Sequence, residues 1–259
     1  MFEKLVAIEP VSLIPSAEEK LHDYAKEVVL YRDIPADDEE IVRRIGDADA
    51  ALLSYTSRMG KNVIERCPNL KYIDVAFTGV DHVDLDAARA KGVKVSNAAG
   101  YSNEAVAELT LCMMLALLRN VPQVEARCRA GQTKDGLVGV ELMGKTVGIV
   151  GVGAIGTRTA ELCHAFGCKV LGNKRHVRGD EPDYIEFVSL EELLSRSDIV
   201  SLHCPLNEDS RGMINKDTIA KMKPGALLIN AARGPVVDSQ ALADALNNGD
   251  LGGAGIDVF

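Results

Sequence analysis

The sequence contains no tryptophan, only 4% aromatic residues, and fewer basic than acidic side chains. Its 259 residues include 29 Lys and Arg against 38 Asp and Glu, a net charge of -9, which argues against nucleic acid or an anionic membrane surface as a partner. With 47% hydrophobic and 26% charged residues, the chain can fill a core and lacks the composition of a disordered protein. We expect most of it to fold, as about two domains.

Long apolar runs and targeting segments are also missing. The longest apolar run, 109–118, is shorter than the roughly 20 residues that cross a bilayer, so we expect no membrane partner. The amino terminus lacks the basic start and cleavage site of a signal peptide, which predicts a cytoplasmic protein. The six cysteines form no Cys-x-x-Cys pair, so we expect reduced, structural thiols and no metal site.

Short β-rich apolar runs alternate with helical patterns, which is typical of an α/β fold with parallel sheets buried on both faces. The first series predicts strands at 5–8, 27–30, 50–54, 72–76 and 93–96, and helices at 17–26, 37–46, 60–66 and 84–91, with N-caps such as Ser16 and Asp84. A long helix over 103–129, interrupted by Pro122, leads to a second series of strands at 146–150, 169–171, 198–202, 227–230 and 253–256. This change of series divides the chain into domains 1–100 and 101–259.

A glycine motif, Gly151-Val-Gly153-Ala-Ile-Gly156, follows a predicted strand and precedes an amphipathic helix over 157–166. The first glycine permits a tight turn, the second lets the backbone approach a pyrophosphate, and the third lets helix and strand pack closely. The bare pattern is a weak signal, and a tight turn without a ligand is the alternative. The strand–turn–helix setting favours dinucleotide binding.

The end of the next predicted strand carries basic side chains where an NAD-binding unit usually has an acid. After Asn173 come Lys174, Arg175 and His176, and Arg178 follows. Positive charge at this position suits the 2′-phosphate of NADP, so the sequence favours NADP over NAD. An ordinary solvated loop is the alternative.

A further strand end carries the segment Asn230-Ala-Ala-Arg233-Gly, followed by Asp238 as the expected N-cap of a helix over 239–247. Open α/β sheets bind their ligands at such strand ends. An arginine there can hold a carboxylate through two parallel hydrogen bonds, whereas a surface arginine without a ligand is the alternative.

Taken in order, these motifs resemble the D-2-hydroxyacid dehydrogenase family, which includes glycerate, hydroxypyruvate, glyoxylate and 3-phosphoglycerate dehydrogenases. The matching segments are 77–85, 105–109, 139–146, 151–156, 197–206, 230–234 and 255–259. The resemblance implies two Rossmann-like domains: a flavodoxin-like substrate domain over 1–100, and a doubly wound, parallel-sheet NAD(P)-binding domain over 101–259. It also implies a homodimer, for which 109–118 is a candidate surface.

The resemblance further implies an oxidoreductase that transfers a hydride between NAD(P)H and a small D-2-hydroxy acid/2-oxo acid pair. Arg233 would be the catalytic anion clamp, and backbone N–H groups around Thr78 and Gly79 would also bind substrate. The implied cofactor contacts are Gly151, Gly153, Ala154, Ile155 and Gly156 at the pyrophosphate, Asn173, Lys174 and Arg175 at the adenosine ribose, and Cys204, Pro205, Ala231 and Asp257 at the nicotinamide half.

The proton donor of this family is a His whose pKa is raised by a Glu. Both normally follow the segment that ends here at Phe259, as does a segment that completes the substrate domain. We therefore expect this chain to bind cofactor but to turn over 2-oxo acids poorly. Only His82 and His203 are placed to substitute, and neither has an evident carboxylate partner. The alternative function is a dinucleotide-sensing interaction protein of the C-terminal-binding corepressor type.

Overall fold

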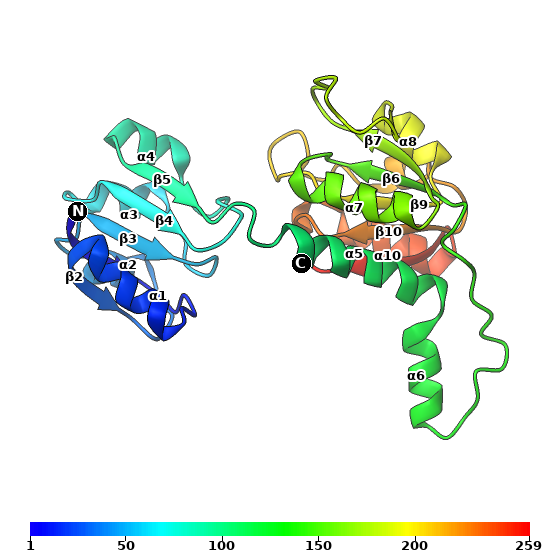
Figure 1. The fold of residues 1–259 in the computed structure, drawn as a ribbon, viewed down its shortest axis with the longest axis horizontal. Coiled ribbons are helices and arrows are strands. Elements are labelled where there is room, and N and C mark those ends of the chain that lie inside the picture. Colours follow the sequence, from blue (N-terminus) through cyan, green and yellow to red (C-terminus); the bar gives the residue numbers. More distant parts are fainter. The chain divides into compact units, whose positions relative to one another are not determined.

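Two parallel sheets, each flanked by helices, make up the structure (Figure 1). The structure is a computed structural model that describes residues 1–259. The chain divides into two units, Met1–Tyr101 (unit 1) and Ser102–Phe259 (unit 2). The predicted α/β fold class is confirmed.

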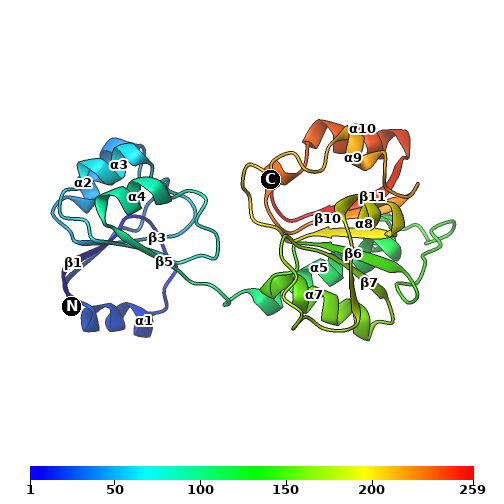
Figure 2. The ribbon, with the colours of Figure 1, turned by 90° about the horizontal axis from the view of Figure 1, so that it is seen from above.

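Unit 1 contains a five-stranded parallel sheet in the order β2-β1-β3-β4-β5, which is the flavodoxin-like order. Its helices α2, α3 and α4 cover one face, and α1 lies on the other (Figure 2). Apolar side chains of the strands alternate toward the two faces of this sheet. Val6, Leu53 and Ile73 belong to one hydrophobic core. The strands are β1 (Phe2–Ala7), β2 (Ala25–Leu30), β3 (Ala50–Leu53), β4 (Tyr72–Val75) and β5 (Lys94–Asn97), and the helices are α1 (Pro15–Lys20), η1 (Leu21–Asp23), α2 (Asp38–Ile45), α3 (Lys61–Arg66) and α4 (Leu85–Lys91).

The prediction of a helix over 17–26 is wrong in its extent. Pro15 occupies the first turn, which its fixed φ favours, so Ile14 and not Ser16 is the N-cap. The helix ends at Lys20, and the chain is already extended in β2 from Ala25. The other predicted cap is confirmed, because the Asp84 side chain accepts a hydrogen bond from the backbone N of Ala87.

Unit 2 contains a six-stranded parallel sheet in the order β11-β10-β9-β6-β7-β8. Strand order reverses between β6 and β9, which is where doubly wound sheets bind dinucleotides. Helices α5 and α7 lie on one face, and α8, α9 and α10 lie on the other (Figure 2). The strands are β6 (Thr146–Val150), β7 (Lys169–Asn173), β8 (Ile185–Phe187), β9 (Ile199–Leu202), β10 (Ala226–Asn230) and β11 (Leu251–Ile256), and the helices are α5 (Asn103–Leu118), α6 (Val121–Arg129), α7 (Ala154–Ala165), α8 (Leu190–Arg196), α9 (Lys216–Ile219), η2 (Gly234–Val236) and α10 (Ser239–Asn248).

The predicted long helix is two helices, α5 and α6, bent by 64°. The break lies at Arg119 and Asn120, and Asn120 adopts a left-handed conformation with φ 54°. Pro122 therefore lies in the first turn of α6 and not at the break itself. Figure 1 shows α6 extending away from the sheet of unit 2, and none of its residues is buried. By length and composition no single helix could cross a membrane, and only this bent pair taken together passes that test.

All six cysteines are free. Cys67, Cys163 and Cys168 are buried, as expected of structural thiols. Cys112 on α5 and Cys128 on α6 are exposed, so the expectation of packed thiols is wrong for these two residues.

Candidate active site

The glycine loop joins β6 to α7. Gly151 has φ 96°, a left-handed conformation, and a Cβ there would lie 2.5 Å from the backbone N of Cys204. A Cβ on Gly156 would lie 2.2 Å from the carbonyl oxygen of Gly151. Around the Cβ position of Gly153, by contrast, there is nothing within 4 Å. The loop therefore has the tight turn, the close helix packing and the open central position that a pyrophosphate site requires.

Helix α7 begins at Ala154, three residues before the predicted start, with Gly153 as its N-cap. The N–H groups of Ala154 and Ile155 thus lie in the first turn, where backbone donors lack partners within the helix. Gly153 and Ala154 are exposed. These donors, together with the open space over Gly153, fit an anionic diphosphate at the positive end of the helix.

The carboxyl ends of the parallel strands bring most of the predicted cofactor residues to one edge of the unit 2 sheet. The backbone N of Gly151 donates to the carbonyl of Asn173, which ties the ends of β6 and β7 together at 2.9 Å. The glycine loop follows β6, Asn173–Arg175 lie at the end of β7, Cys204 and Pro205 follow β9, Ala231 and Arg233 follow β10, and Asp257 follows β11. Neighbouring strands in the sheet therefore end in neighbouring parts of the candidate site.

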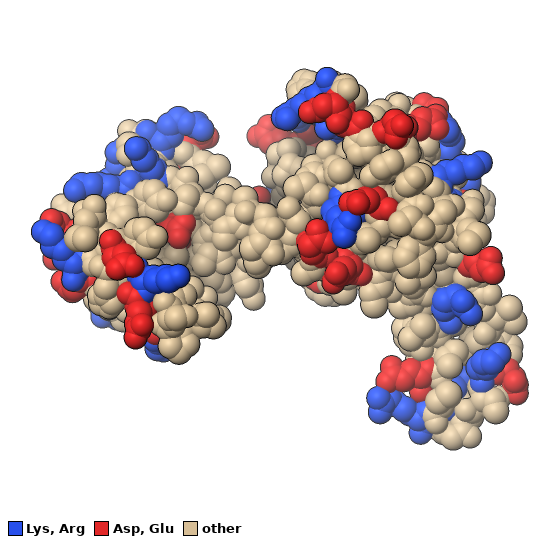
Figure 3. Space-filling view, in the orientation of Figure 1, with Lys and Arg blue, Asp and Glu red and all other residues tan.

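The basic side chains after β7 are paired with acids. Nζ of Lys174 lies 2.6 Å from Oε1 of Glu181, and Arg175 contacts Asp209. Glu181 also accepts hydrogen bonds from backbone N–H groups, and these, with Lys174, lower its pKa to about 2. Both acids lie further along the chain than the segment 173–178, which itself contains no acid. Figure 3 shows basic and acidic side chains intermingled on the face it draws.

The loop that carries Arg233 is held by Asn230, a residue of the same motif for which the sequence predicted no role. The Asn230 side chain is buried; its Oδ1 accepts from the N of Ala232 and its Nδ2 donates to the carbonyl of Arg233, each at 3.0 Å. The backbone N of Asp257 donates to the carbonyl of Asn230 at 3.0 Å. Nη1 of Arg233 donates to the carbonyl of Ala232. The arginine and the predicted nicotinamide contact therefore rest on one hydrogen-bonded frame.

Asp238 caps α10 as predicted, because its Oδ1 accepts from the backbone N of Gln240 and Ala241 at 3.0 Å.

Within unit 1, Thr78 and Gly79 follow the carboxyl end of β4 and are partly buried. The Asn97 side chain donates to the carbonyl of Thr78 at 2.6 Å, which fixes this loop.

His203 is a poor candidate for the proton donor. Its Nε2 lies 2.9 Å from Oγ of Ser201, and its Nδ1 is buried without a hydrogen-bond partner. Burial lowers the pKa of His203 to about 4, so the imidazole is neutral at pH 7. His82 lies in unit 1, where its carbonyl accepts from the N of Met59.

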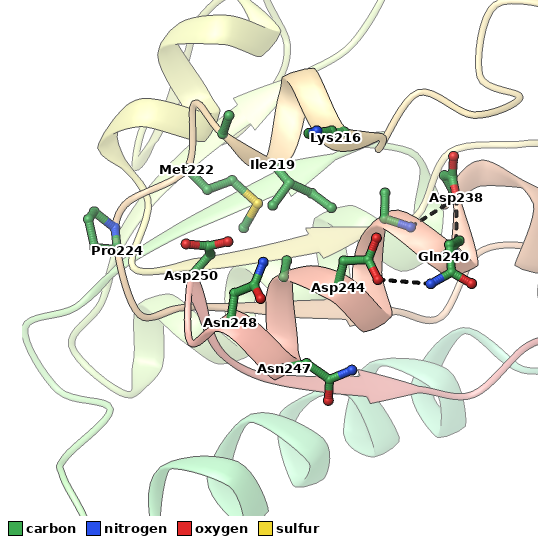
Figure 4. Close-up of a pocket in the computed structure, with 13 residues that line it drawn as sticks. Lys216, Ile219, Met222, Pro224, Asp238, Gln240, Asp244, Asn247, Asn248 and Asp250 are labelled. Atoms are coloured by element: carbon green, nitrogen blue, oxygen red, sulfur yellow. Dashed lines mark hydrogen bonds between the residues drawn. The ribbon is translucent and has the colours of Figure 1, made fainter.

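A large cavity lies between α9 and α10 and not at the strand ends (Figure 4). Its volume is about 810 Å³, and its walls include Ile219, Met222 and Asp244. The side chains of Gln240 and Asp244 are hydrogen-bonded to each other there. None of the predicted site residues lines this cavity. No group of three or more His, Cys, Asp or Glu side chains is placed to hold a metal ion.

Comparison with known sequences identifies relatives that are enzymes. The family model "D-isomer specific 2-hydroxyacid dehydrogenase, NAD binding domain" matches residues 111–259. A glyoxylate reductase of Thermofilum pendens is 41% identical over 236 residues, which cover 88% of this chain and 70% of the relative. A hydroxypyruvate reductase of Blautia hydrogenotrophica is 36% identical, with 89% of this chain and 74% of the relative covered.

Solved structures match the fold closely. An acyclic imino acid reductase in complex with NADPH and D-Arg aligns with a TM-score of 0.92 and 33% identity, covering 99% of this chain and 83% of the other. A D-lactate dehydrogenase from Aquifex aeolicus in complex with NAD and lactic acid aligns with a TM-score of 0.88 and 34% identity, covering 99% and 77%. These matches to enzymes lend no support to the corepressor alternative. The chain therefore belongs to the D-isomer specific 2-hydroxyacid dehydrogenases, a family of NAD(P)-dependent oxidoreductases.

Proposed function

We propose that this chain binds NAD(P)H at the glycine loop and a small 2-oxo acid at Arg233, as a reductase of the glyoxylate or hydroxypyruvate type. The observation that carries the proposal is the shared sheet edge, where β6, β7, β9, β10 and β11 each end in a predicted cofactor or substrate contact. The names of the two sequence relatives support this substrate class.

Each part of this edge has a distinct task. Backbone N–H groups of Ala154 and Ile155 bind the pyrophosphate, and Gly153 leaves it room. A bound nicotinamide would supply a hydride to the carbonyl carbon of the substrate, whose oxygen would also have to take up a proton. Arg233 holds the substrate carboxylate through its planar fork and stabilises negative charge that develops on the carbonyl oxygen. Asp257, on the same frame as Arg233, positions the nicotinamide carboxamide.

We propose that the chain prefers NADP(H) to NAD(H), because Lys174 and Arg175 follow β7 and no acid immediately follows that strand.

We further propose a homodimer in which α5 contributes contact surface, since Leu109 and Cys112 on this apolar helix are exposed. The cytoplasm is the proposed compartment because all six thiols are free. The domain roles that we propose are substrate binding for unit 1 and dinucleotide binding for unit 2.

Calorimetric titration tests the proposal directly. NADPH and NADH should each bind the full chain, and glyoxylate or hydroxypyruvate should bind the complex but not the Arg233→Ala variant. That variant should retain its nucleotide affinity, because Arg233 lies after β10 and not on the glycine loop. If neither nucleotide binds, the proposed function is wrong. If nucleotides bind but the 2-oxo acids bind both proteins equally, the assignment of Arg233 is wrong.

A further inference from the structure

Glu181 lies in a ring of anion-binding groups. Its Oε1 is 2.6 Å from Nζ of Lys174 and 2.9 Å from the backbone N of Arg178, and its Oε2 is 2.7 Å from the backbone N of Gly179. Gly179 has φ 90°, a backbone conformation that residues other than glycine rarely adopt. Successive backbone N–H groups beside a cationic side chain form a nest for an anion.

The nest lies beside the expected position of the adenosine ribose. Lys174 comes directly after Asn173, whose carbonyl accepts a hydrogen bond from Gly151 in the glycine loop. In doubly wound sheets, the side chain at the end of this second strand contacts the ribose 2′ position. The donors that hold the Glu181 carboxylate therefore suit a ribose 2′-phosphate both in their chemistry and in their position.

The two ion pairs of this region differ in their surroundings. The side chains of Lys174 and Glu181 are 21% and 8% exposed, whereas those of Arg175 and Asp209 are 66% and 75% exposed. An exposed pair is screened by water and contributes little, so Arg175 can turn to a ligand at small cost. Lys174 cannot do so without breaking its contact with the Glu181 carboxylate, which two backbone N–H groups also hold in place.

We propose that Glu181 is an internal competitor of the 2′-phosphate of NADP(H), a specificity-determining residue that limits the preference for NADP(H) by occupying the nest of Lys174, Arg178 and Gly179. This inference rests on the proposed binding of the dinucleotide at the glycine loop. The low pKa of Glu181, about 2, agrees with it, because the carboxylate stays charged and seated throughout the ordinary pH range.

The test uses two probes that differ only in the 2′-phosphate, AMP and adenosine 2′,5′-bisphosphate, titrated into the full chain by calorimetry. Glu181→Ala vacates the nest, so it should bind the bisphosphate about tenfold more tightly, the effect of one charge-assisted contact, with AMP affinity unchanged. Asp180→Ala removes an exposed acid from the same loop and is the matched control for charge alone. Its bisphosphate affinity should change much less than that of Glu181→Ala.

A second substitution identifies the nest as the source of the gain. In the Glu181→Ala background, Lys174→Met should cancel most of the increase in bisphosphate affinity. If Glu181→Ala weakens both probes, the residue only orders the loop and the inference is overturned. It is also overturned if Asp180→Ala gives the same gain. Neither result touches the proposed function, which fails separately if the unmodified chain binds neither probe nor NADPH nor NADH.

Discussion

The carbonyl oxygen of Gly151 lies 2.2 Å from the position that a Cβ on Gly156 would occupy. The first turn of α7 thus rests on the glycine loop with no room for a side chain between them. Gly153, in the same loop, has nothing within 4 Å of its Cβ position. One substitution, Gly to Ala, therefore tests packing at one position and ligand access at the other.

Gly156→Ala should lower the free energy of unfolding by about 1–3 kcal/mol, because the added methyl group meets backbone that must shift. Urea denaturation measures this change. Gly153→Ala is the control: it should lose less stability than Gly156→Ala, because its added methyl group meets no other atom and only the N-cap position is affected. It should nevertheless bind NADPH more weakly, since its methyl group takes the space proposed for the pyrophosphate. Unchanged NADPH affinity in Gly153→Ala would contradict that location.

Arg233→Lys keeps the positive charge but loses the planar fork that holds a carboxylate through two bonds. We expect the affinity for glyoxylate or hydroxypyruvate, measured in the presence of NADPH, to fall about tenfold or more. The affinity for NADPH alone should not change. Arg89→Lys, at an exposed arginine of unit 1, is the control for the same chemical change elsewhere. A Lys variant that binds the 2-oxo acid as tightly as Arg would refute the two-bond clamp.

His203 should make stability depend on pH. Burial lowers its pKa from 6.5 to about 4 in the folded chain. The unfolded state therefore binds more protons between these pH values, so stability falls as the pH is lowered from 6.5 toward 4. The loss is at most about 3 kcal/mol. Unfolding free energies measured across this range should fall less steeply for His203→Gln. His22→Gln, at an exposed histidine, should follow the unmodified chain, and parallel curves for all three proteins would count against a buried neutral His203.

Arg175→Ala should weaken NADPH binding about tenfold and leave NADH binding unchanged, because only NADPH carries the 2′-phosphate. The exposed contact with Asp209 does not hold Arg175 back from a ligand. Titration of both cofactors measures the effect, and Arg211→Ala removes another exposed arginine as a control. An equal loss for NADH and NADPH would show that Arg175 does not discriminate between them.

Most strands were predictable because parallel strands buried on both faces leave continuous apolar runs, as in Ala50–Leu53. Strand β8 was missed, since it has only three residues, of which Ile185 alone is buried. The break before α6 was predicted at Pro122, because proline was the only visible signal, whereas the left-handed Asn120 forms the break. Local chemistry does not reveal where a chain with several acceptable turns will bend.

In the candidate site, the glycines were predictable because a missing side chain has a direct geometric meaning at a βα turn. The pairing of Lys174 with Glu181 was not, because it depends on a loop that folds back through Gly179. Asn230 stood in the recognised motif, but its two hydrogen bonds within the loop exist only once Ala232 and Arg233 turn around it. Sequence spacing identifies residues that meet a ligand more readily than residues that hold those residues in place.

Helix α6 has nine residues and none of them is buried. A helix shorter than about 12 residues is marginal in water without packing against other parts of a protein. The helicity of α6 should therefore depend on what covers it. If a second copy of the chain does so, folding of α6 and association form a single equilibrium, and the melting temperature rises with protein concentration. A chain that works alone would melt at one temperature at every concentration, with backbone amides of α6 exchanging rapidly with solvent deuterium.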